Sequence, residues 1–254
     1  MSELPLHVEI NKHVACIYFS RSSSDNGINA NFAEELRGAI DCLEHNDQIR
    51  VLLITGSGGS FCVGTDFGSL NQNSIETFKS LKISDFVAGF SKPVIAVLNG
   101  KALDQGLEAA LACDFRLAAE GAKLGLQQVS NGLIPWDGGT QRLPRLVGES
   151  RAIEIILSGR LIDVDEAQSI GLVDDVFLTD ELMDGAMSLA EIIAGHGPIA
   201  ARYVKEAIKA GQDMSLDNGL RLEADLNILL QSTSDRSEGI QSFLEKRKPI
   251  FRGN

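Results

Sequence analysis

The segment spanning residues 93–118 constrains the fold of this chain more than any other. Residues 93–98 form a short apolar, β-branched run typical of a buried strand, and Asn99-Gly100 breaks it. Residues 107–113 are apolar except for Glu108, and a carboxylate in the first turn of a helix is stabilised by the unpaired N–H groups there. The pattern predicts strand, turn, helix and strand. Because its neighbours are apolar, Glu108 either caps the helix or lines a cleft, and the segment alone leaves both readings open.

Strands and helices continue to alternate on both sides of this segment. Residues 50–55 are a nearly continuous run of Leu and β-branched residues, which predicts a central strand buried on both faces. We expect Asn31 to cap a helix over residues 31–44. Further strands are expected at residues 6–10, 13–20, 123–126 and 172–177. Further helices are expected at residues 75–90, 140–148, 149–158, 164–170, 181–194, 198–210, 216–231 and 236–248.

Two loops stand out for their composition. Residues 56–68 are rich in glycine and hydroxyl side chains, but they lack both the Gly-Lys-Ser/Thr ending of a nucleotide loop and the spacing of a dinucleotide fingerprint. Residues 127–139 are rich in turn formers and contain the single tryptophan, Trp136, beside Asp137. Long loops carry function more often than helices do, so the second loop is a candidate part of a site.

The charge balance argues against two classes of partner. The formal net charge is −12 and the isoelectric point is about 4.8. A protein that binds nucleic acid or anionic lipid needs a basic face, which this balance disfavours, so we expect neither partner. The N-terminus lacks the features of a signal peptide, and no apolar run approaches ~18 residues. We therefore expect a soluble cytoplasmic protein with no membrane partner.

The four cysteines do not form a recognisable metal or disulfide pattern. Their positions lack Cys-x-x-Cys spacing and lie in largely apolar surroundings, so we expect reduced core residues and no metal site. They are Cys16, Cys42, Cys62 and Cys113. From residue 180 onward only helical patterns remain, and the last two helices carry apolar stripes that a small annex could hardly bury alone, which hints at contact between subunits.

Several segments together resemble the crotonase superfamily, the enoyl-CoA hydratase/isomerase fold. Phe61-Cys-Val-Gly-Thr-Asp66 matches the family pattern F-C-A-G-x-D. Asn99-Gly100, Gly106-Leu-Glu108 and Cys113-Asp114 follow in order, and then the segment from Gly132 to Leu143. Residues 26–36 and 243–248 extend the resemblance over nearly the whole chain.

The resemblance implies an α/β fold in which repeated ββα units form a spiral. Residues 1–195 would form this core with its acyl-CoA site, and residues 196–254 a C-terminal helical region used for trimerisation. The expected ligand is an acyl-CoA thioester, and the expected assembly is a homotrimer or a hexamer built as a dimer of trimers. No separate cofactor is expected, since CoA is part of the substrate.

The resemblance also assigns catalytic roles. The main-chain N–H groups of Thr65 and Gln105 correspond to the oxyanion donors, and such donors suit a thioester oxygen that becomes enolate-like during the reaction. Glu108 matches the first catalytic glutamate of the hydratases, whereas the second glutamate falls on Gln128. A neutral amide orients water but cannot transfer a proton, so the usual two-glutamate mechanism is in doubt. Asp137 is a candidate replacement acid or base.

These residues could also have purely structural roles. Asp137 could cap the helix that begins at Gly138 or Gly139, and Gln128 could be a loop residue that bonds the backbone. Asp104-Gln105 stands where the family usually has Gly-Gly, so a left-handed backbone at Gln105 would carry strain of ~1–2 kcal/mol.

Substrate-binding positions follow from the same resemblance. Val63, Gly64 and Asp66 surround the first oxyanion donor, and Trp136 borders the acyl group. A lysine frequent in the family is Gly68 here, so contacts with the CoA adenine and phosphate would rely on further residues from a neighbouring subunit. These are Phe243 and Lys246. Without a role in binding, Phe243 would be a core side chain and Lys246 a solvated charge.

The implied activity is that of a lyase of the enoyl-CoA hydratase type, acting in fatty acid or aromatic acid metabolism. It would add water across a conjugated C=C of a CoA thioester, or remove it. Alternatives on the same fold are isomerisation, C–C cleavage, thioester hydrolysis, or hydration of a cyclic or aromatic-derived enoyl-CoA, for which stacking on Trp136 is a hint. A further alternative is a homologue that binds acyl-CoA without turning it over.

Overall fold

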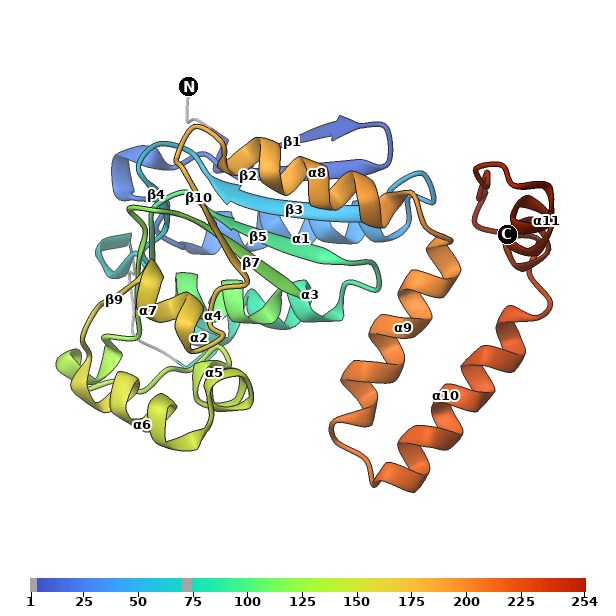
Figure 1. Ribbon diagram of the computed structural model, residues 1–254. Coiled ribbons are helices and arrows are strands. Elements are labelled where there is room, and N and C mark those ends of the chain that lie inside the picture. Colours follow the sequence, from blue (N-terminus) through green and yellow to red (C-terminus); the bar gives the residue numbers. More distant parts are fainter. Residues whose placement is uncertain (1–3, 70–74) are drawn as a thin grey trace.

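The computed structural model describes residues 4–69 and 75–254, and two sheets organise that part of the chain. In the six-stranded sheet β1 pairs antiparallel with β2 and the remaining neighbours are parallel (Figure 1). Its strands, in spatial order, are β1 (Leu6–Asn11), β2 (Val14–Phe19), β3 (Val51–Gly56), β5 (Val94–Leu98), β7 (Phe115–Ala119) and β10 (Asp175–Phe177). The four-stranded sheet contains β4 (Ser60–Cys62), β6 (Lys101–Leu103), β8 (Lys123–Gly125) and β9 (Ile162–Asp163).

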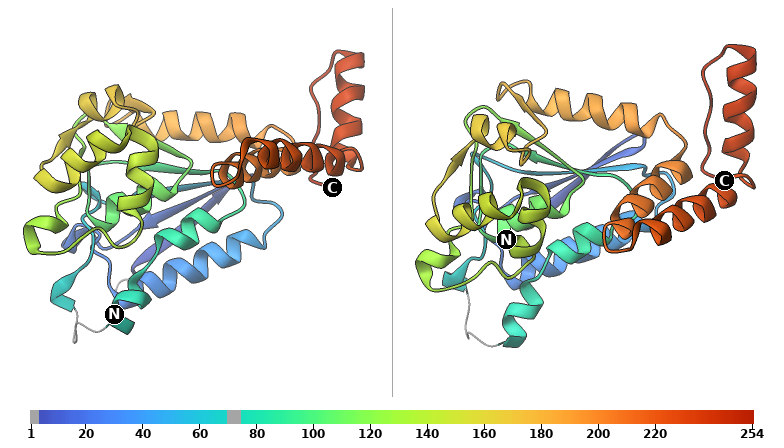
Figure 2. Two further views of the ribbon diagram at one scale, coloured as in Figure 1. Left: turned by 90° about the horizontal axis from the view of Figure 1, so that it is seen from below. Right: turned by 60° about the horizontal axis from the view of Figure 1, so that its bottom comes forward.

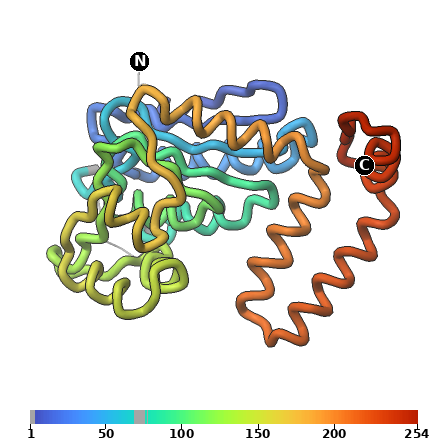
Figure 3. The backbone as a smooth tube through the Cα atoms, in the orientation of Figure 1, coloured from blue at the N-terminus to red at the C-terminus, as the bar shows by residue number. Residues whose placement is uncertain are grey.

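The two sheets gain their strands alternately along the chain. The order β3-β5-β7 in the large sheet is matched by β4-β6-β8 in the small one, so each pass of the chain adds one strand to both sheets before a helix returns it. This is the predicted spiral of ββα units, and the α/β fold is confirmed. Figure 3 shows the backbone winding through these passes. Since the strands of one sheet run parallel, the segments that follow them gather on one side of the spiral.

Two hydrophobic layers hold the large sheet. Side chains alternate along β3, so that Leu52 and Ile54 join the main core while Val51 and Leu53 face the second cluster under α8 (Leu182–Ala194). Every residue of β3 is buried, as the sequence predicted for a central strand. The main core is covered by α1 (Ala30–Glu44), α2 (Ile75–Leu81) and α3 (Ser84–Gly89), and α4 (Gln105–Ala112) lies within it. The segment after β8 forms α5 (Gly139–Val147), α6 (Glu149–Ser158) and α7 (Val164–Ser169).

The C-terminal helices project away from the sheets (Figures 1 and 2). They are α9 (Pro198–Gly211), α10 (Leu216–Leu230) and α11 (Ser234–Glu245), and the expected domain boundary at residues 195/196 falls between α8 and α9. Asp114, which precedes β7, anchors α9 because its carboxylate lies 2.7 Å from the Nζ atoms of both Lys205 and Lys209. Arg50 donates to the carbonyl oxygens of Ala194 and Phe251 and so ties the C-terminal tail to the core.

Several details differ from the sequence expectations. The cap of α1 is Asn29, whose side chain accepts from the Phe32 N–H at 2.9 Å, so the helix begins before Asn31. Residues 75–90 form two helices rather than one, broken before Ser84. The short strands β4, β6 and β9 were not predicted because two or three residues carry too little alternation, and the last strand starts later than expected, at Asp175.

The cysteine prediction is mostly confirmed. Cys16, Cys62 and Cys113 are buried and free, and burial raises the pKa of each thiol to about 12. Cys42 is free but exposed on α1, contrary to the expected core position. Over residues 4–69 and 75–254, no helix is both long and apolar enough to span a membrane.

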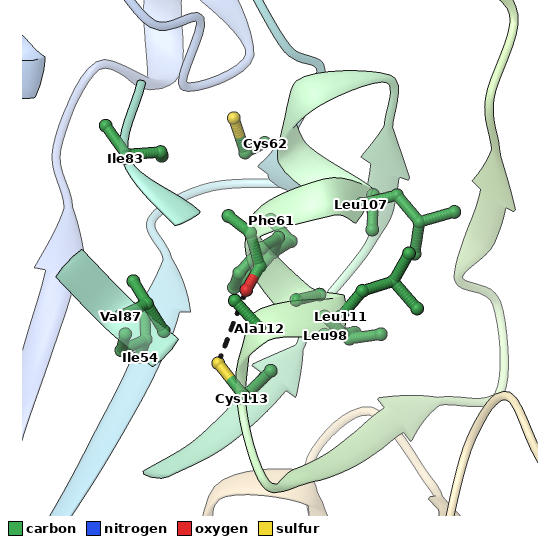
Figure 4. Packing of buried hydrophobic residues seen from close by; sticks show 14 of the residues in the cluster. Ile54, Phe61, Cys62, Ile83, Val87, Leu98, Leu107, Leu111, Ala112 and Cys113 are labelled. Carbon is green, nitrogen blue, oxygen red and sulfur yellow. Dashed lines mark hydrogen bonds between the residues drawn. The ribbon is translucent and has the colours of Figure 1, made fainter. Parts of the chain in front are cut away.

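Helix α4 sits at the centre of the main core, where Leu107 and Leu111 pack beside Phe61 (Figure 4). Its approach to β4 is so close that a Cβ atom on Gly106 would overlap the carbonyl group of Cys62. Glycine at this position therefore permits the contact between the helix and the small sheet.

This contact generates a stability prediction. Replacing Gly106 by Ala should lower the free energy of unfolding by about 2 kcal/mol or more, because the backbone of Cys62 cannot yield as a flexible side chain would. Gly38→Ala is the matched control, since Gly38 is exposed within α1 and an added Cβ meets nothing within 4 Å. It should stabilise by about 0.5–1 kcal/mol in the same denaturation experiment. Equal effects of the two changes would contradict the close-packing account.

Candidate active site

The start of α4 has an unusual backbone. Asp104, the residue before the helix, has φ 48° and ψ −125°, and its carboxylate accepts from the Gln127 N–H at 2.6 Å. Backbone strain was expected at Gln105, but it lies one residue earlier, because Gln105 is already the first helical residue. As the first residue of α4, Gln105 has an N–H with no acceptor inside the helix. This N–H is therefore available to a ligand.

The loop around Thr65 presents a second N–H. Ile28 pairs with Thr65 as an isolated parallel bridge, donating to the Gly64 carbonyl and accepting from the Asp66 N–H, both at 2.8 Å. Because these bonds use the residues on either side of Thr65, the N–H of Thr65 itself points away from Ile28. Gly64 has a positive φ of 95°. A Cβ atom there would lie 3.1 Å from the Gln105 N, which shows how closely the two loops approach.

Glu108 lies one turn into α4 and is fully buried. Its Oε1 accepts from the N–H groups of Asp137 and Gly139 at 2.8 and 2.7 Å, and its Oε2 accepts from Gln128 Nε2 at 3.1 Å. Gly139 is the first residue of α5, so Glu108 caps a helix other than its own. Glu108 is thus a helix cap, but of α5 rather than of its own helix, and it is a buried acid.

The environment of Glu108 shifts its proton affinity. Burial raises the pKa of Glu108 to about 7 because the charged form loses its hydration. The N–H groups of Gly139 and Asp137 oppose that shift by stabilising the charge, and the nearby Asp137 carboxylate adds to it. Near neutral pH the protonated and ionised forms of Glu108 are therefore both populated, as a group that gives and takes protons requires.

Asp137 is buried with 1% of its surface exposed. Its Oδ2 accepts from the N–H groups of Ile83 and Ser84 at 3.0 and 3.2 Å and from Gln105 Nε2 at 2.9 Å. Asp137 therefore holds the start of α3. The expectation that it caps α5 is wrong, because its hydrogen bonds go to Ile83, Ser84 and Gln105 and the start of α5 is bonded by Glu108 instead. Its other oxygen, Oδ1, makes no hydrogen bond within the part of the chain that the structure describes.

Gln128 begins a short 3-10 helix, Gln128–Asn131, and is 4% exposed. Its amide donates to the Glu108 side chain, so the reading in which this side chain bonds the backbone is wrong. Among residues 4–69 and 75–254, its Oε1 has no hydrogen-bond partner. The buried acid Glu108 thus has two neighbours, Gln128 and Asp137, that each keep one oxygen unused, and buried unused acceptors commonly mark a place for water or a ligand.

The remaining predicted positions fall into two groups. Near Thr65, Val63 is half-buried, and Asp66 forms an ion pair with Arg21 at 2.8 Å. Trp136 is half-buried and meets the Phe78 ring edge-on at a centroid distance of 5.4 Å. By contrast, two positions lie on or beyond α11, away from α4 in both views of Figure 2. These are Phe243, which is 81% exposed, and Lys246, which follows the helix with φ 55°.

Sequence reasoning missed the residues at the junction of α2 and α3. Ile83 and Ser84 bind Asp137, and the Leu81 carbonyl accepts from Gln105 Nε2 at 2.7 Å. Their apolar pattern fits one continuous helix, so the sequence offered no signal for this role. No group of three or more His, Cys, Asp or Glu side chains in the described ranges is arranged to hold a metal.

The pKa of Glu108 generates a prediction about stability. The folded state holds the proton on Glu108 more tightly than the unfolded state, in which the pKa of this carboxyl group is the ordinary 4.5. The contribution of the protonated Glu108 to folding stability is therefore greatest at acid pH and is lost as the pH rises through about 7. Glu108→Gln should retain the hydrogen bonds, since the Gln128 amide can turn its unused oxygen toward the new NH₂ group. The stability of this variant relative to the parent should rise by about 2 kcal/mol between about pH 5.5 and 8.5.

Denaturant unfolding at several pH values measures this difference. Glu34→Gln, which changes an exposed carboxyl on α1, is the control for the loss of one acid. Parallel stability curves for the Glu108→Gln variant and the parent would show that Glu108 does not titrate as a buried acid.

Comparisons with known proteins identify the family of this chain. The family model described as enoyl-CoA hydratase/isomerase matches residues 9–254. The 2,3-dehydroadipyl-CoA hydratase of Escherichia coli is 37% identical over 256 residues and covers 100% of both chains. The crotonyl-CoA hydratase of Syntrophomonas wolfei is 38% identical over 250 residues and covers 96% of both.

A solved structure gives the same result for the fold. The enoyl-CoA hydratase of Bacillus anthracis superposes with a TM-score of 0.95 at 39% identity, covering 98% of this chain and 100% of that one. The crotonase-like spiral inferred from the motifs is therefore confirmed. With its matched sequence, fold and buried glutamate, the chain belongs to the enoyl-CoA hydratase/isomerase family.

Proposed function

We propose that this enzyme adds water across a C=C bond conjugated to the carbonyl of a CoA thioester, or removes it in the reverse direction. The observation that carries the proposal is the placement of two main-chain N–H groups, from Thr65 and Gln105, beside a buried glutamate one turn further along the same helix. Relatives named 2,3-dehydroadipyl-CoA hydratase and crotonyl-CoA hydratase support this reaction class.

The two N–H groups would bind the thioester oxygen. Attack at Cβ pushes electrons onto that oxygen and produces an enolate, so donors fixed in advance stabilise charge that appears only during the reaction. The N–H of Gln105 lies at the positive end of α4, which adds to the effect. Loss of one such donor typically costs about 10²–10³ in rate.

Glu108 and Gln128 would hold the attacking water between them. The water would donate one hydrogen to Glu108 Oε2 and the other to Gln128 Oε1, which is otherwise unused in the described residues. Glu108 would take the first proton as the water oxygen forms its bond to Cβ. A carboxylate whose pKa is near 7 is well matched to this step at neutral pH. Gln128 would orient the water without exchanging a proton.

Asp137 would supply the second proton. Oδ1 would give a proton to Cα while the enolate returns to the thioester. Solvent would then return a proton to Asp137 and take up the one on Glu108, so that the protons balance over the cycle. The bonds to Ile83, Ser84 and Gln105 hold only Oδ2, which leaves Oδ1 for this transfer. Every step is assigned to a residue of the chain, so we propose no cofactor beyond the CoA in the substrate.

Isomerisation of the double bond is the second candidate. It also needs two proton-transfer groups but no attacking water, and the replacement of the second glutamate by Gln128 favours it to that extent. Trp136 and Phe78 would border the acyl group in either case. Product analysis with crotonyl-CoA and with a 3-enoyl-CoA separates hydration from isomerisation.

The C-terminal helices would assemble the protein into trimers or a hexamer of two trimers. They expose many large apolar side chains, which the proposed neighbours would bury. On α9 to α11 these are Val204, Ile208, Leu216, Leu220, Ile228, Leu229, Ile240, Phe243 and Leu244. Phe243 and Lys246 would reach the CoA of an adjacent subunit. We place the protein in the cytoplasm, in keeping with its free cysteines.

Three variants test the assignments of the two acids. Glu108→Gln should lower kcat for crotonyl-CoA hydration by at least about 10², since its amide cannot accept the proton. Asp137→Asn should lower kcat by a similar factor while keeping the fold, because the amide oxygen can still accept the three bonds to Oδ2. Asp137→Ala removes those bonds and should also destabilise the protein.

Steady-state kinetics with thermal unfolding separates chemistry from scaffolding. An Asp137→Asn variant with nearly full activity, beside an unstable Asp137→Ala variant, would reduce Asp137 to the anchor of α3. A loss below about tenfold in Glu108→Gln would rule out the proton transfer assigned to Glu108.

A charge on α10 tests the assembly. Ile228→Glu, at a site 67% exposed, should dissociate the oligomer and raise KM for the CoA ester, because the neighbouring Phe243 and Lys246 would be lost. Leu157→Glu, also at a site 67% exposed but on α6, makes the same change elsewhere and should leave at least the trimer intact. Sedimentation together with KM measures both effects, and a monomeric parent protein would overturn the assembly.

A further inference from the structure

The side chain of Gln105 is fully buried and bonded at both ends. Its Oε1 accepts from Thr65 Oγ1 at 2.8 Å, and its Nε2 donates to the Leu81 carbonyl at 2.7 Å and to Asp137 Oδ2 at 2.9 Å. The same residue carries the first main-chain N–H of α4. One residue therefore contacts both the Thr65 loop and the second acid.

The chemistry of these contacts requires an amide. The Leu81 carbonyl can only accept, so it fixes Nε2 on its own side of the amide plane and leaves Oε1 toward Thr65. The Thr65 hydroxyl must then act as donor. A glutamate would face the carbonyl and the Asp137 carboxylate with an oxygen. An apolar side chain of the same length would remove all three bonds, and Asp137 Oδ2 would keep only the N–H groups of Ile83 and Ser84 as donors.

We propose that the Gln105 side chain is a positioning residue for the reaction. It sets the separation of the Thr65 loop from the first N–H of α4, and by occupying Asp137 Oδ2 it leaves Oδ1 for proton transfer. The segment that carries it stands where the family resemblance led us to expect Gly-Gly, so this brace is a feature of the present sequence. The inference rests on the proposed function, because it assumes that Thr65 and Gln105 bind the thioester oxygen.

The brace also explains why the α2–α3 break lies where it does. The Leu81 carbonyl and the N–H groups of Ile83 and Ser84 all turn toward the Gln105 and Asp137 side chains.

A structural role and a positioning role of Gln105 predict different effects. Loss of a purely structural brace would affect stability alone, whereas loss of a positioning residue would also weaken the stabilisation of charge on a bound thioester oxygen. Small displacements of aligned groups are known to cost up to about 10² in rate.

The test uses the full-length protein with two CoA esters. Acetoacetyl-CoA reports oxyanion stabilisation directly, because its enolate absorbs in the near ultraviolet and the keto form does not. Crotonyl-CoA reports kcat and KM. Gln105→Met retains length and removes the three bonds, and Thr65→Val removes only the hydroxyl donor. Thr65→Ser keeps that donor and serves as the conservative rescue, and Gln168→Met, an exposed glutamine on α7, is the matched control.

The positioning role predicts a graded loss. Gln105→Met should lower the bound enolate fraction and reduce kcat by about tenfold to a hundredfold with less than about threefold change in KM. Thr65→Val should reduce kcat by about threefold to tenfold, Thr65→Ser should restore most of it, and Gln168→Met should match the parent. The Thr65→Val effect should shrink when Gln105 is already Met, since both changes break the same bond.

Two results would overturn the inference in distinguishable ways. If the parent forms enolate and turns over substrate while the folded Gln105→Met protein does so equally well, the brace is structural only and the proposed function stands. If the parent itself gives neither enolate nor turnover, the oxyanion site fails and the positioning role fails with it. Should Gln105→Met not fold, equal enolate fractions and kcat values in Thr65→Val, Thr65→Ser and the parent would decide against positioning.

Discussion

The burial of a single carboxyl group, that of Glu108, is the constraint on which the rest of the site depends. A buried carboxylate without partners is costly, so the surrounding chain must supply donors. It does so from two directions, with main-chain N–H groups at the start of α5 and the amide of Gln128. These donors do not fully compensate the lost hydration, and the remaining imbalance leaves the pKa near neutrality. The cost to stability and the capacity for proton transfer thus have the same origin.

The spiral of ββα units explains why the required groups meet. Each pass of the chain adds a strand to both sheets, so the segments after β4, β6 and β8 become neighbours although they are distant in sequence. The segment after β4 brings Thr65, the segment after β6 brings Gln105 and Glu108, and the segment after β8 brings Gln128. The glycines at 64 and 106 allow these layers to approach closely. The topology therefore brings these segments together, and the local sequence supplies the side chains that they carry.

The sequence predicted the repeating architecture and singled out the buried residues Glu108, Gln128 and Asp137, but not how they bond. Strand β3 and helix α6 could be located because their apolar patterns are long and regular. The partners of Asp137 could not be located, since they belong to a helix break hidden within a continuous apolar pattern. Likewise, strain was expected at Gln105 and lies at Asp104, because the exact start of a helix depends on tertiary contacts.

The central claim is that Glu108 is a buried acid that exchanges a proton near neutral pH. The most direct measurement is the difference between the carboxyl infrared or carbon-13 spectra of the parent and the Glu108→Gln variant, followed as a function of pH. The account predicts a carboxyl group that is lost in the variant and titrates in the parent with a midpoint at about pH 7. A midpoint close to the ordinary value of 4.5 would contradict the account, because Glu108 would then remain ionised throughout the neutral range.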